Sequence, residues 1–357
     1  MSKQLLYLIL FGLVFSCTKH SQIADLEIPS SLPKFEILVN NDEAFDGYIF
    51  LRKIESPGAQ FMINSEGQIV WYQISDTTIL RVFTPNDRSY IALYTNKDIH
   101  EITYDGDTLL TLSYGDGGFD KILHHEIIKD RNNHILALTK EIIRIDLSEL
   151  GGKQLDTIKT DGIIKLSETG QKLWSWSLEQ VLDPLKYPEI NRFKNDWGHA
   201  NALAVDDDGH YLISWRDFNQ VWKINNESGE IIWKYGAETI KRAHDKIYHP
   251  HCIHRNLDGD YMVFDNGMAD IRRSSRAVMF NRFGDSIRNT LIIELPDSLF
   301  TVRQGSVYQF AEDRFLFSST MRKILTITNR QGDILWLAKS DHAFYRAYYL
   351  DKAILTR

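Results

Sequence analysis

Three histidines stand close together in the stretch YHPHCIHRNLDGDYMVFDNG, which covers residues 248–267. His249, His251 and His254 make up a quarter of the 12 histidines in the 357-residue chain. An imidazole can ligate a metal ion, transfer a proton or attack an electrophile, and it can also simply pack in a core. The choice depends on the elements that present the three side chains.

A zinc site is one interpretation of this cluster, because each of the three imidazoles could supply a nitrogen ligand. On an extended strand, however, His249 and His251 share one face, whereas His254 falls on the other. The spacing therefore favours separate roles for the three side chains, and we expect neither a metal nor an organic cofactor.

An internal repeat defines the elements around the cluster. The unit is Gly, two residues, an aliphatic residue and usually Trp, and its six copies start 39 to 64 residues apart. The four copies with Trp begin at Gly67, Gly170, Gly229 and Gly332, and the two without it begin at Gly106 and Gly284. Intervals of this size are typical of the four-stranded blades of β-propellers.

Each copy has the pattern of a β-hairpin. The alternating strand Gln220-Val-Trp-Lys-Ile-Asn225 is followed by a turn, in which Gly229 suits a backbone with positive φ. The Trp then lies on the returning strand, where we expect it to pack between neighbouring blades. Six units of four strands predict an all-β fold, a six-bladed β-propeller that occupies residues 34–357 without a large additional domain.

Two further features complete this predicted architecture. The segment Phe35 to Asn40 is expected to supply a strand that closes the ring with the C-terminal sequence. Few stretches have helical periodicity, and the best of them runs from Leu178 to Leu185 in the longest insertion.

The propeller brings distant histidines together. The first strand of each blade lies beside the central axis, and its start shares a rim with the end of the second strand. His125, His199 and His251 precede first strands of three successive blades, and Arg216 follows a second strand. Each residue alone is more often a turn residue or a surface charge, but the set at matching positions predicts a site at the mouth of the central funnel. We interpret the remaining histidines His124, His134, His210 and His244 as structural or solvent-facing.

Several motifs resemble those of the bacterial arylsulfate sulfotransferases. They are Asp196-Trp-Gly-His-Ala-Asn-Ala-Leu203, Leu212-Ile-Ser-Trp-Arg216, His124-His-Glu-Ile127, Asp258-Gly-Asp260, Phe264-Asp-Asn-Gly267, Gly305-Ser-Val-Tyr-Gln309 and Phe344-Tyr-Arg-Ala347. Each motif is weak, but the ordered set runs from about residue 35 to 350 and is specific. The resemblance implies a six-bladed propeller that moves a sulfuryl group from one phenol to another through a sulfated histidine, without a nucleotide sulfate donor.

Carried over by position, the resemblance implies that His251 is the nucleophile. It implies that His125, His199 and Arg216 bind the sulfuryl oxygens and assist the leaving phenol. One departure is Cys252, which stands where an acidic residue commonly follows the nucleophile. The larger members also carry an extra N-terminal β-domain and a disulfide, for which this chain has no room.

Weaker substrate-binding candidates are Asn201, Thr320 and Tyr345, the last as a ring that could stack on the aryl group. The expected partners are a small aryl sulfate donor and a phenolic acceptor. A sulfate monoester spreads one negative charge over three oxygens, so an Arg fork and imidazole donors can hold it. A phenol, with a pKa of ~10 like tyrosine, leaves readily once it is partly protonated. Attack by a neutral imidazole would split the transfer into two steps.

Two other functions remain open from the sequence. The motif Glu168-Thr-Gly-Gln-Lys-Leu-Trp174 looks like the repeat of quinone-dependent alcohol dehydrogenases, but those rings have eight blades and carboxylate-rich calcium sites. A non-catalytic propeller that acts as a binding or assembly scaffold is the second alternative, although it would not need three histidines and an arginine at one mouth.

The N-terminal sequence predicts export. Residues 1–16 contain an apolar run of 12 residues, Leu5 to Ser16, which is too short to span a bilayer and suits a lipoprotein signal peptide. Cys17 would then be lipidated, residues 17–33 would form a tether, and the domain would sit at the outer membrane, facing the periplasm or the surface. The only other cysteine is Cys252, so the exported domain is expected to lack an internal disulfide. A net charge of −7 without a basic cluster argues against nucleic acid, and only the lipid anchor is expected to contact the membrane.

Overall fold

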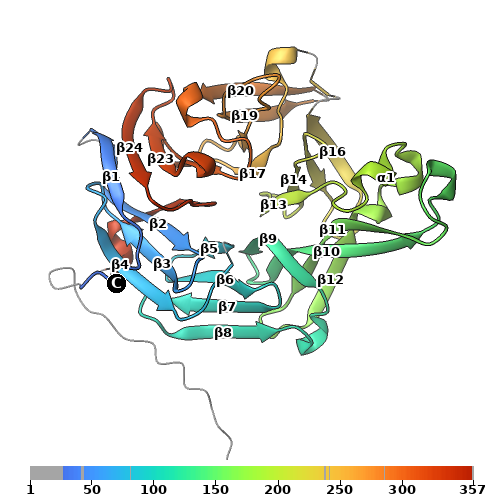
Figure 1. The fold of residues 1–357 in the computed structure, drawn as a ribbon, viewed down its shortest axis with the longest axis horizontal. Coiled ribbons are helices and arrows are strands. Elements are labelled where there is room, and N and C mark those ends of the chain that lie inside the picture. The colour runs from blue at the N-terminus through green and yellow to red at the C-terminus, as the bar shows by residue number, and fades with distance from the viewer. Residues whose placement is uncertain are drawn as a thin grey trace, which may run out of the picture.

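The structure, a computed structural model, describes residues 27–41, 44–80, 82–236, 239–240, 242–284 and 286–355. These residues form six antiparallel sheets arranged in a ring around a central axis (Figure 1). The prediction of an all-β, six-bladed β-propeller is therefore confirmed. The predicted signal peptide, the lipidation site Cys17 and the first part of the tether lie outside the described residues.

Blades 2 to 5 each consist of four strands that follow one another in the chain. Blade 2 contains β5 (Phe83–Pro85), β6 (Ser89–Thr95), β7 (Asp98–Thr103) and β8 (Thr108–Ser113). Blade 3 contains β9 (Ile122–Lys129), β10 (Ile135–Ile145), β11 (Asp156–Leu166) and β12 (Lys172–Ser177). Blade 4 contains β13 (Ala200–Val205), β14 (Tyr211–Trp215), β15 (Gln220–Ile224) and β16 (Ile231–Gly236). Blade 5 contains β17 (His251–Arg255), β18 (Tyr261–Asp265), β19 (Arg276–Phe283) and β20 (Ser286–Glu294).

The two ends of the described chain close the ring. Blade 6 contains β21 (Ser306–Ala311), β22 (Arg314–Ser319), β23 (Ile324–Thr328) and β24 (Ile334–Ser340), and β1 (Phe35–Asn40) pairs with β24 as a fifth strand. Blade 1 contains β2 (Gly47–Lys53), β3 (Gly58–Ile63) and β4 (Ile69–Ser75), and its first strand is β25 (Tyr348–Asp351). The predicted closure by Phe35 to Asn40 is confirmed, and β25 adds a second one.

Three of the repeated Trp residues join their blade to the next one by a hydrogen bond. The indole Nε1 of Trp71 donates to Tyr104 O of blade 2 at 2.8 Å, and Trp174 reaches blade 4 in the same way. Trp336 Nε1 donates to Ser65 O at 2.7 Å and thereby ties blade 6 to blade 1. The glycines that begin these repeats have positive φ, as the hairpin turn requires.

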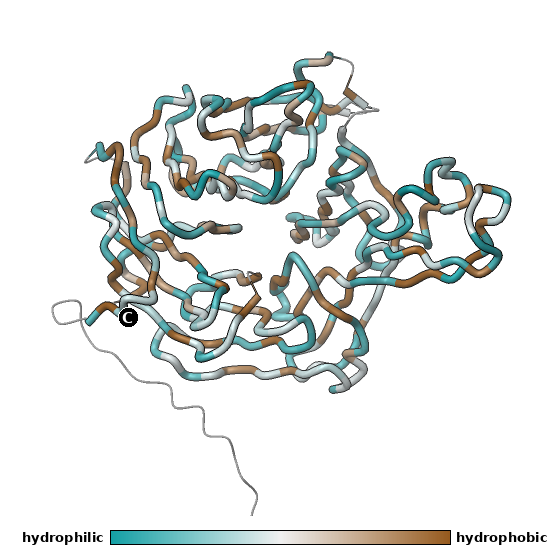
Figure 2. The backbone as a smooth tube through the Cα atoms, viewed as in Figure 1, coloured by the Kyte–Doolittle hydropathy of each residue, from teal (hydrophilic) through white to brown (hydrophobic). Residues whose placement is uncertain are grey.

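Six buried hydrophobic clusters stabilise the ring, and each lies between two adjacent blades. Hydrophobic stretches accordingly recur in all six blades (Figure 2). Because every blade buries both of its faces against neighbours, the inner strands are held rigidly and can position side chains at the axis.

The insertion between blades 3 and 4 does not form the helix that the periodicity of Leu178 to Leu185 indicates. Leu178–Gln180 and Pro184–Lys186 are isolated 3-10 turns, and the short α-helix α1 lies later, at Ile190–Phe193. Pro184 lacks an N–H and its ring would clash with the preceding turn, so a helix cannot run through it. In the described part of the chain no helix is long and apolar enough to span a membrane.

Candidate active site

Irregularities in three inner strands aim the predicted site residues at the axis. The pairing register shifts in β9 beside His125, in β13 after Ala200 and in β17 after His251. His125 and His199 both have φ of 53°, a left-handed conformation that is uncommon for residues other than glycine. Bulges and such strained residues are concentrated at functional sites, where they redirect a side chain.

Gly198 lets the chain adopt this geometry before His199. Its φ is 95°, and a Cβ there would lie 2.9 Å from the ring of Trp215 on the paired strand. The Trp-Gly-His order of the sequence is thus required locally, because only glycine permits this close approach.

The three predicted histidines meet around one tyrosine. The ring centroids of His125 and His199 are 5.0 Å apart, and those of His125 and His251 each lie 6.2 Å from that of Tyr345. Residues more than 120 positions apart in the sequence therefore share one mouth of the central channel. The fold brings together the set that the blade positions predict.

Hydrogen bonds fix the protonation of His251. Its Nδ1 lies 2.6 Å from Asn266 Oδ1 and 2.9 Å from His249 O, and both atoms are acceptors. Nδ1 must therefore carry the proton, which leaves a lone pair on Nε2. Such a nitrogen is an available nucleophile.

The amide of Asn266 is itself held in one orientation. Its Nδ2 donates to Thr301 O and to Gln304 O, at 2.7 Å each, so Oδ1 has to face His251. Asn266 is completely buried. The sequence places this residue at the end of a second strand, the position equivalent to that of Arg216, but its role in orienting the nucleophile was missed.

Burial keeps His251 and His125 neutral. Burial, reinforced by the charge of Arg346, lowers the pKa of His251 to about 3. Burial also lowers the pKa of His125 well below its usual value, and the neighbouring histidines add to this effect. His251 is therefore unprotonated throughout the physiological range, as nucleophilic attack requires.

Arg216 and His199 form a polar group beside these rings. Arg216 Nη1 donates to His199 Nε2 at 3.2 Å, and its Nε donates to Asp217 at 2.6 Å. His199 Nδ1 lies 2.6 Å from Asp196 Oδ2. Burial opposes ionisation of Asp196, but the hydrogen bond from His199 and the charge of Arg216 prevail and lower its pKa. The carboxylates thus orient a cationic fork and an imidazole toward the mouth.

His124, which the sequence suggested was structural or solvent-facing, is buried and contacts the site. Its Nδ1 lies 2.7 Å from His125 Nδ1, and its Nε2 lies 3.1 Å from Asp161 Oδ1. No sequence signal beyond its adjacency to His125 distinguishes it, because the contact with Asp161 depends on the pairing of β9, β10 and β11.

The segment that precedes β25 forms the floor of the site. It reaches into the middle of the ring in Figure 1, where Tyr345 Oη donates to Asn201 O at 3.0 Å. Arg346 lies against the Tyr345 ring and donates to Asn201 O, Gly305 O and the Glu126 carboxylate. One short segment thereby ties together blades 3, 4 and 6 below the histidines.

The weaker candidates line the same region, and their substrate contacts stay predictions. Asn201 is buried, and its amide donates to Pro250 O and accepts from Ser214 Oγ, so it supports the loop before His251. Thr320 lies at the end of β22, and its hydroxyl donates to Phe344 O at 2.7 Å. Both side chains therefore hold the frame of the site.

Cys252 and His254, which follow His251 in the opening stretch, make contacts of their own. Cys252 is buried, its Sγ points to Val307 O in blade 6, and burial raises the pKa of the thiol. His254 packs against Tyr308 of blade 6, with ring centroids 4.8 Å apart. Among the described residues no group of three or more His, Cys, Asp or Glu side chains is arranged to hold a metal ion.

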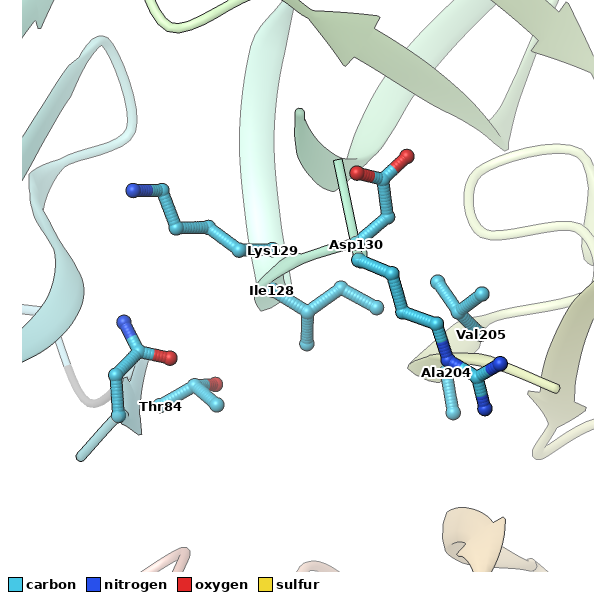
Figure 3. Close-up of a pocket in the computed structure, with 8 residues that line it drawn as sticks. Thr84, Ile128, Lys129, Asp130, Ala204 and Val205 are labelled. Carbon is cyan, nitrogen blue, oxygen red and sulfur yellow. The ribbon is translucent and has the colours of Figure 1, made fainter. Parts of the chain in front are cut away.

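A pocket of about 280 Å³ lies at the opposite mouth of the channel (Figure 3). It is lined by the far ends of inner strands, including Thr84, Lys129 and Val205. Lys129 is paired with Glu101 at 2.6 Å, and Arg131, which also lines the pocket, is paired with Asp207. The strands run from the histidine mouth to this one, so the pocket is separate from the candidate site.

Comparison with one solved structure supports the fold, and two further structures are less similar. A protein of unknown function from Bacteroides caccae superimposes with a TM-score of 0.52 at 13% identity, covering 83% of this chain and 94% of that one. A streptogramin B lyase gives a TM-score of 0.47 at 13% identity, with 89% and 88% of the two chains covered. BamB from Moraxella catarrhalis gives 0.41 at 14% identity, with 94% and 97% covered. At these identities the likeness to the Bacteroides caccae protein concerns the fold alone.

The family comparison is more specific. No curated protein gives a significant match to the sequence. The model of the arylsulfotransferase (ASST) family matches residues 36–282, which is more than half of the chain and includes His125, His199, Arg216 and His251. The chain therefore belongs to the arylsulfotransferase family, a membership that implies a transferase of the sulfotransferase type.

Proposed function

We propose that this protein transfers a sulfuryl group from an aryl sulfate to a phenolic acceptor in two displacements through a sulfohistidine at His251. The observation that carries the proposal is the pair of acceptors at His251 Nδ1, Asn266 Oδ1 and His249 O. They leave a lone pair on Nε2. No nucleotide takes part in this scheme.

In the first step, Nε2 of His251 attacks sulfur as the S–O bond to the aryl group breaks. The electron pair of that bond stays on the phenolic oxygen, which receives a proton from His125. The sulfated ring becomes cationic, and its Nδ1–H then makes charge-assisted hydrogen bonds to Asn266 and His249. The sulfuryl group is thereby activated for the second displacement.

In the second step, the acceptor phenol attacks sulfur, the N–S bond breaks and its electron pair returns to His251. The acceptor loses its proton to His125. Arg216 holds the sulfuryl oxygens throughout, since an always-charged planar fork suits three oxygens that share one charge, and His199 supports the fork through its contact with Nη1. Tyr345 stays a candidate for stacking on the aryl ring.

Initial-rate kinetics with a chromogenic aryl sulfate and a phenol test this function. We expect parallel lines in double-reciprocal plots, because the first product leaves before the acceptor binds. Intersecting lines would favour a single displacement in a ternary complex. Absence of transfer over a panel of aryl sulfates, with the protein folded, would leave the binding-scaffold alternative in its place.

We also propose that the propeller is an outer-membrane lipoprotein anchored through Cys17. The proposal rests on the 12-residue apolar run and the Ser16-Cys17 step. Incorporation of a labelled fatty acid in the wild type and its loss in Cys17→Ala would support it. Labelling that is unchanged in the variant would contradict it.

A further inference from the structure

We infer that His124 and Asp161 form a proton relay that positions His125 and exchanges a proton with it during each half-reaction. The inference rests on the proposed function, because it assigns partners to the acid that serves the leaving phenol. His124 and Asp161 are 8% and 3% exposed, so neither lies on the surface.

The contacts define a chain of three side chains. Asp161 Oδ2 accepts from the backbone N–H of Ala200 at 2.7 Å, which anchors the carboxylate to the start of β13. Its Oδ1 lies 3.1 Å from His124 Nε2, which is within ion-pair distance, and among the described residues that nitrogen makes no hydrogen bond of good geometry. His124 Nδ1 lies 2.7 Å from His125 Nδ1.

The Nδ1–Nδ1 contact dictates how protons are shared. Two imidazole nitrogens at hydrogen-bond distance must hold one proton between them, because two bare nitrogens would repel. The acceptor Asp161 Oδ1 faces Nε2 of His124, so an N–H is placed there, and in the resting relay the proton shared by the two Nδ1 atoms also lies on His124. His125 then accepts at Nδ1 and carries its own proton on Nε2, the nitrogen left free for the substrate.

This arrangement balances the protons of both steps. In the first step, His125 gives its Nε2 proton to the departing phenolic oxygen, and the Nδ1 proton of His124 moves to Nδ1 of His125. In the second step, the acceptor phenol gives its proton to Nε2 of His125, and the proton on Nδ1 returns to His124. His124 keeps its Nε2–H beside Asp161 throughout, so the cycle needs no proton from solvent.

Leaving-group dependence in His124→Asn distinguishes a relay from a packing role. The amide can still contact His125 but cannot deliver a proton. General acid assistance is worth about 10²–10⁴-fold, so we expect kcat/KM for phenyl sulfate to fall roughly 100-fold or more, and that for a nitrophenyl sulfate by less than about 3-fold. The nitrophenolate needs little protonation to leave.

His134→Asn is the matched control. His134 also pairs with an aspartate, since its Nδ1 lies 3.0 Å from Asp130 Oδ2, but it precedes β10 at the opposite rim. We expect this variant to retain full activity with both donors.

Equal losses with the two donors in His124→Asn, or no loss with phenyl sulfate, would overturn the relay. Asp161→Asn, which keeps the shape and removes the charge, should show the same selective loss and provides the test if His124→Asn does not fold. Failure of the wild-type protein to transfer from either donor would refute the proposed function instead.

Discussion

The hydrogen bond from His251 to Asn266 provides a quantitative test of the proposed nucleophile. In Asn266→Ala the 2.6 Å contact with Nδ1 is lost, while His249 O still favours a proton on that nitrogen. The reactive tautomer is therefore kept, and the variant should remain active. A hydrogen bond to a group that becomes cationic contributes about 1.5–3 kcal/mol, so the rate of sulfation should fall roughly 10- to 150-fold.

The same substitution should lower stability. Thr301 O and Gln304 O lose the donor that lies 2.7 Å from each. Each buried acceptor left without a partner costs about 1–3 kcal/mol. Because water can enter the vacated space, we expect the loss for the two carbonyls together to lie near the lower end of the summed range, at about 2–4 kcal/mol. Urea denaturation measures this loss.

Single-turnover release of a chromogenic phenol measures the sulfation rate directly. Asn256→Ala is the matched control, because Asn256 is similarly buried at the other end of β17, where its Oδ1 accepts from the Asp260 N–H at 2.8 Å. It should lose stability and keep its rate. An unchanged sulfation rate in folded Asn266→Ala would refute the role assigned to this hydrogen bond.

Three further outcomes are expected. Arg216→Lys should lower kcat/KM for the donor roughly 10- to 150-fold with little change in melting temperature, because an ammonium cannot replace the planar fork; unchanged kinetics would exclude the clamp. The pKa of His251 is about 3 in the folded protein and ~6.5 when unfolded, so protons favour the unfolded state as the pH falls from 6.5 toward 3. Between pH 7 and 5 the wild type should therefore lose roughly 2 kcal/mol more of its unfolding free energy than His251→Asn does, measured in urea. Trp336→Ala should cost about 3–5 kcal/mol by the same assay, since this fully buried ring joins blades 6 and 1. Half-buried Trp174→Ala should cost less, and equal losses would argue against a special role for ring closure.

The sequence contains enough information to predict the ring and the position of its site. The hairpin repeat is visible because Gly supplies the turn and Trp fills the space between blades in most copies. The blade register then places His125, His199 and His251 at one mouth. Closure by β1 is predictable because an unpaired strand at the start of a propeller needs a partner.

The supporting residues of the site are harder to predict, because they act through contacts across strands. The sequence indicates only that Asn266 belongs to an Asp-Asn-Gly turn. The fold is needed to show that two carbonyls of the loop before blade 6 hold its amide. His124 reads as the neighbour of His125. The bulge in β9 leaves it buried beside Asp161, which lies 37 residues later in the sequence. The left-handed φ of His125 and His199 likewise has no signature in residue type alone.

Cys252 is the converse case, because its position in the sequence suggests a role in the site that its contacts do not support. Its place beside the nucleophile suggests involvement in the chemistry. The structure turns it away, because its φ of 59° follows the register shift in β17 and directs Sγ to blade 6. An acidic residue at this position is thus not what holds His251, whose Nδ1 is occupied by Asn266 and His249.

The central claim is that His251 carries the sulfuryl group between donor and acceptor. Mixing the protein with an aryl sulfate and no acceptor, followed by intact-mass measurement and peptide mapping, tests it most directly. We predict one added SO₃ group per chain, located on His251, released on addition of a phenol and absent in His251→Asn. Phenol release without a sulfated protein, or sulfation that persists in His251→Asn, would contradict the account.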